Sequence, residues 1–172
     1  MTTVTFEIHA VRGSDVEELG EDELARRLDV GGDDANALIE MDPLEGAIVI
    51  ESADARAAIL DELDSAVQRL CFEAVVALIE HGAEPYIYQY FNTDLNAELV
   101  PSGRTFELRG QDIPSTHHQR DALLKSLYAC GTRYLAWLER LQQAGREATV
   151  QLAHLRPFAD RARAALRHHG LA

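Results

Sequence analysis

The chain is 172 residues long and 47% hydrophobic, which is enough to bury the core of one domain without disulfides or a structural metal. Its 29 acidic and 16 basic side chains give a net charge of −13. Such acidity repels phosphate backbones and anionic lipid, so we expect neither direct nucleic-acid binding nor attachment to a membrane surface. No stretch reaches the ~18 apolar residues that span a bilayer.

An alternating pattern opens the chain. Apolar side chains take every second position at Val4, Phe6 and Ile8. This is the spacing of a half-buried strand. Ser14 then predicts a short helix, because Glu17 follows it at the spacing of a capping box. Two more short helices are expected over residues 21–28 and 33–41.

The middle of the sequence combines strands with one long apolar stripe. Residues 46–51 form a short β-branched run that is typical of a central strand. Residues 53–81 contain neither Gly nor Pro, and their apolar side chains recur at spacings of three and four. This pattern predicts a long helix that ends at Gly82. Three further strands are expected, over residues 86–91, 95–100 and 105–109.

Two helices complete the predicted elements. A second long helix follows Pro114–Thr116 and ends at Gly145, and a final helix covers residues 157–169. The order of the elements predicts an α+β fold in a single domain of residues 1–172. In it, a mainly antiparallel sheet of about four to five strands is covered by two long helices plus short helices.

The sequence predicts no catalytic residue, no cofactor and no metal site. The pairs His117–His118 and His168–His169 are adjacent, and no two histidines have the i, i+4 spacing of helical metal ligands. Cys71 and Cys130 lie in apolar stretches, where burial is expected to raise the thiol pKa and keep both thiols inert. Gly31–Gly32 precedes two aspartates, which carry the wrong charge for a phosphate cradle.

The expected compartment is the cytoplasm. Two cysteines 59 positions apart are typical of a reduced protein, and the first ten residues lack the pattern of a signal peptide. Among the 16 basic residues only Lys125 is a lysine, a preference that suggests a GC-rich bacterial genome.

A row of tyrosines is the most informative motif. In a strand, Tyr86, Tyr88 and Tyr90 share one face. Tyrosine is enriched at protein interfaces because it offers a large rigid contact area and a polar tip. Three interpretations stay open: the row packs under a long helix with its hydroxyls at the rim, it binds a partner, or it lines a small-molecule pocket.

The leading hypothesis is a non-enzymatic binding module that neutralises or escorts a basic partner protein. The chain is similar in size and composition to toxin-neutralising immunity proteins and secretion chaperones. Residues 1–86 carry 21 acidic and 5 basic side chains, and this imbalance favours a basic partner. The tyrosine row is the expected anchor. The expected steering charges are Glu21, Glu23, Asp33 and Asp34.

Two other functions remain possible. One is a small enzyme or small-molecule sensor with a pocket between sheet and helices. In it, arginines near His117 and His118 would hold an anionic ligand, the candidates being Arg104, Arg109 and Arg120. The other is a self-associating structural or regulatory protein, because widely apolar helices can bury their second face against a copy of themselves. A homo-oligomer is therefore possible.

Overall fold

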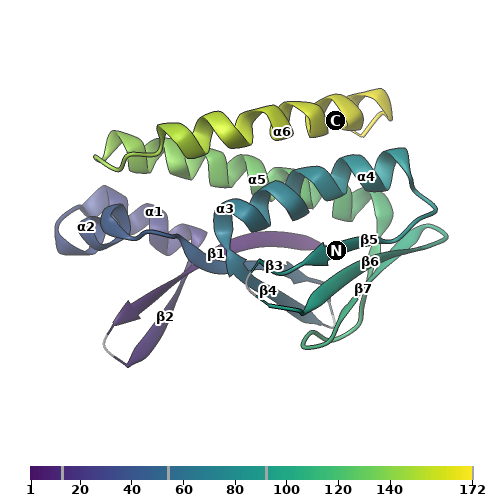
Figure 1. Cartoon of the computed structure of the whole chain (residues 1–172), viewed down its shortest axis with the longest axis horizontal. Coiled ribbons are helices and arrows are strands. Elements are labelled where there is room, and N and C mark those ends of the chain that lie inside the picture. Colours follow the sequence, from purple (N-terminus) through teal and green to yellow (C-terminus); the bar gives the residue numbers. More distant parts are fainter. Residues whose placement is uncertain (13, 54, 92, 172) are drawn as a thin grey trace.

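The computed structural model describes residues 1–12, 14–53, 55–91 and 93–171, and within them the chain has an α+β fold (Figure 1). The strands are β1 (Thr3–Arg12), β2 (Asp15–Gly20), β3 (Glu45–Glu51), β4 (Arg56–Glu62), β5 (Tyr86–Gln89), β6 (Asn96–Ser102), β7 (Thr105–Gly110) and β8 (Thr116–Gln119). The helices are α1 (Glu21–Val30), α2 (Asp33–Glu40), α5 (Arg120–Gln143), α6 (Thr149–His168) and one continuous helix composed of α3 (Leu63–Ala66), the π-helical η1 (Val67–Glu73) and α4 (Ala74–Glu80).

The first sheet, sheet A, has the strand order β2-β1-β3-β4, and all its pairings are antiparallel. Phe6 of β1 lies beside Ile48 of β3, and both are buried. At the beginning of β3, Gly46 pairs with Ile8. A Cβ atom at Gly46 would lie 2.0 Å from the backbone oxygen of Glu7, so only glycine lets β3 approach β1 this closely.

The second sheet, sheet B, has the order β5-β6-β7-β8, also with antiparallel pairings. Alternate residues of these strands are buried, namely Tyr88, Ala97, Leu99, Phe106, Leu108, Thr116 and His118. The period of two is what a sheet with one face in the core requires. One hydrophobic cluster includes residues of both sheets, so the two sheets share a core.

The long helices lie together on one side of the strands, with α5 between α6 and the sheets (Figure 1). The ring of Phe6 meets that of Tyr134 of α5 edge-on, with centroids 5.2 Å apart. Trp137 of α5 is 5% exposed and also contacts Phe6. The hairpin of β1 and β2 extends beyond this layer, at the lower left of Figure 1.

Two segments predicted as helical are strands of sheet A. Residues 15–20 were expected in a short helix begun by Ser14, but they pair with β1 along their whole length. Residues 56–62 were expected at the start of the long helix, but they form β4. Ala57 and Ile59 alternate into the core there, opposite Ile50 and Ile48 of β3. Pairing with a distant segment therefore overrides the local helical pattern.

A third strand replaces the expected start of the second long helix. His118 is buried with Thr116, whereas His117 between them is exposed, and this alternation places residues 116–119 in β8. The sequence predicts a single sheet of about four to five strands. The described residues instead form two four-stranded sheets. The final helix also begins earlier than expected, at Thr149, and contains Pro157.

The two cysteines lie together between η1 and α5. Both are fully buried and not in a disulfide. Burial, followed by the neighbouring Cys130, raises the pKa of Cys71 well above its usual value, which confirms the expectation for that thiol. Among the described residues, no helix is long and apolar enough to cross a membrane.

Candidate functional site

The face of sheet A opposite the long helices carries polar groups beside exposed apolar ones. Because side chains alternate along β1, Phe6 and Ile8 enter the core and Glu7 and His9 lie on the outer face. Pairing of β1 with β3 ends at Ile8, so from His9 onward β1 pairs with β2 alone. Leu60 of β4 faces outward and is 54% exposed.

Two surface hollows meet on this face, and both are lined by His9 and Glu45. The first, of about 440 Å³, extends toward α2 and is lined on that side by Asp34, Glu40 and Asp42. The second, of about 230 Å³, extends toward β5 and is lined there by Leu60, Asp61, Glu62 and Tyr90. We name the two hollows together the acidic groove.

Carboxylates crowd one end of the acidic groove. The pKa of Glu62 is raised by partial burial, and also by repulsion from neighbouring acids. These acids are Asp64, Asp61, Asp42 and Glu45. Arg146 lies 3.9 Å from Asp42, but its guanidinium is buried and donates to the backbone oxygens of Ile39 and Met41. A cation from outside would therefore relieve repulsion at this end.

Asp61 connects the two sheets beside the groove. Its Oδ2 accepts hydrogen bonds from the hydroxyl of Tyr88 at 2.5 Å and from the backbone N–H of Phe91 at 2.9 Å. Asp64, in the first turn of the following helix, accepts from the buried Tyr134 hydroxyl at 2.6 Å. Burial is the main cause that raises the pKa of Asp64. Asp61 and Asp64 therefore hold structural hydrogen bonds. Neither was among the steering charges expected from the sequence.

The structure places the three tyrosines of the row at different depths. Tyr88 is 1% exposed, and its ring meets that of Tyr90 edge-on at 5.4 Å. Tyr86 is half-buried and donates to the backbone oxygen of Arg69 at 2.8 Å. Tyr90 is half-buried at the acidic groove. Tyr88 is therefore packed away from solvent, whereas Tyr86 and Tyr90 keep part of their surface exposed, Tyr86 at a separate hollow beside Phe158 and Tyr90 at the acidic groove.

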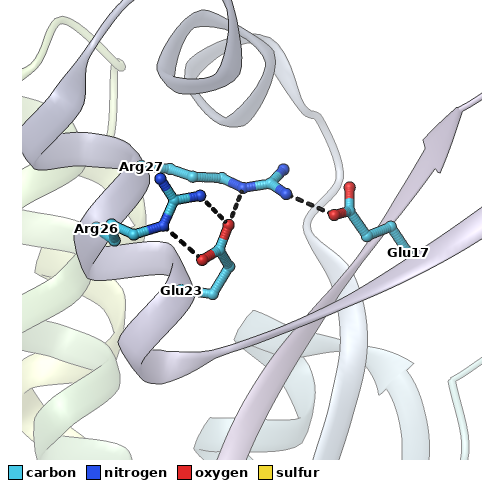
Figure 2. A network of polar contacts seen from close by, with 4 residues as sticks. All are labelled: Glu17, Glu23, Arg26 and Arg27. Carbon is cyan, nitrogen blue, oxygen red and sulfur yellow. Dashed lines mark hydrogen bonds and ion pairs between the residues drawn. The ribbon is translucent and has the colours of Figure 1, made fainter.

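Glu23, predicted as a steering charge, is held by two arginines (Figure 2). Its Oε1 accepts from Arg27 Nε at 2.8 Å, and its Oε2 accepts from Arg26 Nε at 2.7 Å. These bonds lower the pKa of Glu23 to about 2. Arg27 also donates to Glu17 at 2.5 Å and thereby links α1 to β2. The charge of Glu23 is thus largely compensated inside the protein.

The other three predicted steering residues are distributed over α1 and α2. Glu21 accepts from Arg133 Nε at 2.6 Å and from the backbone N–H of Phe6 at 3.2 Å, which attaches α1 to α5 and β1. Asp33 and Asp34 are exposed in the first turn of α2. Of the seven residues expected to bind a partner, the acidic groove brings together Asp34 and Tyr90.

Three of the groups expected to hold an anionic ligand, Arg109, Arg120 and His118, have other partners. Arg109 forms an ion pair with Glu98 at 2.8 Å, and Arg120 donates to the backbone oxygen of Leu78 at 2.9 Å. His118 is buried, and its pKa is lowered by burial and then by His117. The space between sheet A and α5 is filled by core side chains such as Phe6 and Tyr134.

Sequence reasoning missed most of the groove, and it missed a mixed group of side chains beside it. Glu7, His9 and Glu18 bring their ligand atoms within 4.8 Å of one another. Histidine metal ligands were expected at helical spacings, whereas Glu7 and His9 have the i, i+2 spacing that shares one face of a strand. The i, i+2 spacing of Glu7 and His9 in a predicted strand was the sequence signal that could have identified this group.

No protein-family model, curated protein or solved structure matches the chain.

Proposed function

We propose that the protein is a non-enzymatic binding module that holds a basic, partly apolar segment of a partner protein in the acidic groove, and so neutralises or escorts that partner. One observation carries the proposal. Exposed Leu60 and half-buried Tyr90 lie beside a group of mutually repelling carboxylates around Glu62. Such a surface offers apolar contact and a favourable field to the same ligand.

The apolar side chains and the carboxylates of the groove have different roles in this proposal. Leu60 and Tyr90 supply apolar area that leaves water when a partner binds, and aromatic residues of this kind often dominate binding energy. The carboxylates at Glu45, Glu62 and Asp42 lie near the rim of a surface hollow, where charge accelerates association more than it strengthens the complex. Raising the salt concentration should therefore slow association chiefly through these acids.

The tyrosine row expected to anchor a partner does not act as one unit in this proposal. Tyr88 is bonded to Asp61 and buried, so its contribution to binding would be indirect, through the position of Tyr90 and of the β4 end. The filled core between sheet A and α5 favours this proposal over a small-molecule pocket in that layer.

Selection from a random-peptide display library tests the ligand class without assuming a partner. We expect enriched peptides to combine Arg or Lys with leucine or aromatic residues. A labelled enriched peptide is then titrated against wild-type protein and against Glu45→Gln/Glu62→Gln, which removes two charges. The matched control is Asp22→Asn/Glu84→Gln, which removes two exposed charges outside the groove.

The proposal requires weaker binding and slower association for the groove variant, with the control close to wild type. Leu60→Ser should weaken the same peptide without changing the salt dependence. Enrichment of acidic peptides, or equal loss in both double variants, would contradict the assignment of the groove.

A further inference from the structure

We propose that Glu7, His9 and Glu18 form a binding site for one divalent transition-metal ion, of the Zn²⁺ class, on the outer face of sheet A. The inference does not depend on the proposed function. It rests on the antiparallel pairing of β1 with β2, on the buried Nε2 atom of His9 and on the chemistry of the three donor groups.

The strand register assembles the site. Glu7 and His9 are two positions apart on β1, so their side chains leave the same face. Glu18 lies directly opposite His9 on β2. The ligand atoms of all three lie within 4.8 Å of one another, and His9 Nε2 is 3.5 Å from Glu7 Oε1. Bonds of about 2.0–2.2 Å to a tetrahedral zinc would separate two ligand atoms by about 3.3–3.6 Å.

The Nε2 atom of His9 is the independent observation. It is buried and has no hydrogen-bond partner among the described residues; Glu7 Oε1 lies 3.5 Å away, at ion-pair distance. The side chains of His9 and Glu7 are only 15% and 14% exposed. A buried polar atom without a partner is costly, and a bound ion or water is a usual explanation. A metal ion would give this nitrogen its missing partner.

The donor set selects the class of metal. One imidazole nitrogen with two carboxylates suits zinc and similar borderline ions, whereas Mg²⁺ and Ca²⁺ prefer all-oxygen sites. Three protein ligands leave a position for water or for a donor atom of another molecule. Glu18 is exposed, so the ion can enter from solvent.

Arg56 adjusts the charge of the site. Its Nη2 lies 3.1 Å from both carboxylate oxygens of Glu7. Each carboxylate oxygen has two lone pairs, so Glu7 can accept from Arg56 and still coordinate an ion. The guanidinium orients the carboxylate but also repels a cation. We therefore expect Arg56→Gln to bind Zn²⁺ more tightly than wild type, if Glu7 keeps its position.

Calorimetric titration of the chelator-treated full chain with ZnCl₂ tests the site, and Co²⁺ absorption reports its coordination. We expect one Zn²⁺ per chain and the visible bands of Co²⁺ in a low-coordinate site, with no comparable binding of Mg²⁺. Glu18→Gln should weaken Zn²⁺ binding by at least about tenfold, a loss that even outer-shell changes can cause. Because Glu18 is exposed, this variant should fold normally.

Two controls separate the site from other groups. Asp15→Asn removes an exposed charge from the same hairpin, and His168→Gln/His169→Gln removes the histidine pair at the end of α6. Both should bind Zn²⁺ like wild type, whereas His9→Gln should lose the site and the Co²⁺ bands. The proposal is overturned if wild type takes up no Zn²⁺, if Mg²⁺ binds equally well, or if Glu18→Gln and His9→Gln bind unchanged.

Discussion

Replacing Tyr88 by Phe removes one hydroxyl and leaves the ring in place. That hydroxyl donates to Asp61 Oδ2 at 2.5 Å, and the tyrosine is 1% exposed. A hydrogen bond to a charged group contributes about 1.5–3 kcal/mol to stability. The carboxylate keeps the backbone N–H of Phe91 at 2.9 Å, so it is not left without a partner. We therefore expect Tyr88→Phe to lower the free energy of unfolding by about 2 kcal/mol.

Tyr86→Phe is the matched control within the same strand. Its hydroxyl donates to a neutral backbone oxygen, that of Arg69, at 2.8 Å. A neutral hydrogen bond contributes about 0.5–1.5 kcal/mol, so this variant should lose roughly half as much stability as Tyr88→Phe. For a chain of this length, a loss of 2 kcal/mol lowers Tm by about 4–8 °C.

Chemical denaturation at neutral pH measures both losses, and Asp61→Asn completes a double-mutant cycle with Tyr88→Phe. The coupling energy between the two changes should account for most of the loss in Tyr88→Phe. If Tyr88→Phe is no more destabilising than Tyr86→Phe, or if the coupling is near zero, the assignment of Asp61 as the connection between the sheets is wrong.

Three further predictions follow from particular contacts. Gly46→Ala would place a Cβ atom 2.0 Å from the Glu7 oxygen and should destabilise the fold by about 3 kcal/mol or more, whereas Gly20→Ala meets no atom within 4 Å and should be close to neutral; thermal unfolding compares them. The Glu23 carboxyl should titrate near pH 2 in an NMR experiment and nearer 4.5 in Arg26→Gln/Arg27→Gln. Because the folded pKa of Glu23 is lowered, its contribution to stability is complete above the unfolded pKa and is lost as the pH falls toward 2. Both cysteines are fully buried, so a thiol reagent should modify neither in the native protein and both in denaturant; rapid native labelling would refute the burial.

The α+β class could be predicted from sequence, but three of the strands could not. Residues 56–62 contain apolar side chains that suit the stripe of the following helix as well as a strand. The chain changes conformation at Glu62, and the N–H of Leu63 donates to the backbone oxygen of Leu44 at 2.8 Å. That partner is distant in sequence, so a local pattern cannot locate the boundary.

The candidate site was harder to predict, because it depends on which face of a strand is inward. Alternation shows that Tyr86, Tyr88 and Tyr90 share a face, but it does not show that Ile87 and Phe91 are the exposed ones, at 57% and 61%. The group of Glu7, His9 and Glu18 needs the register of β2, a segment that the sequence predicts as helical. Because residues 15–20 were predicted as a helix, the sequence could not place Glu18 beside Glu7 and His9.

The pairing of its acids explains why α1 is a weaker steering surface than the acidic groove. Glu21 pairs with Arg133 at 2.6 Å, and Asp29 pairs with Arg140 at 2.7 Å. Acids of the N-terminal half thus attach α1 to basic residues of α5, and part of the negative charge is compensated within the fold.

Glu62 differs, because its charged neighbours are other acids, namely Asp64, Asp61, Asp42 and Glu45. A partner responds to the local field, and that field is strongest where carboxylates face each other without nearby exposed cations. Counting acids along the sequence locates the excess of charge. Ion pairs in the fold decide where that charge stays uncompensated. Under the proposed function, the partner is therefore expected at the groove rather than at α1.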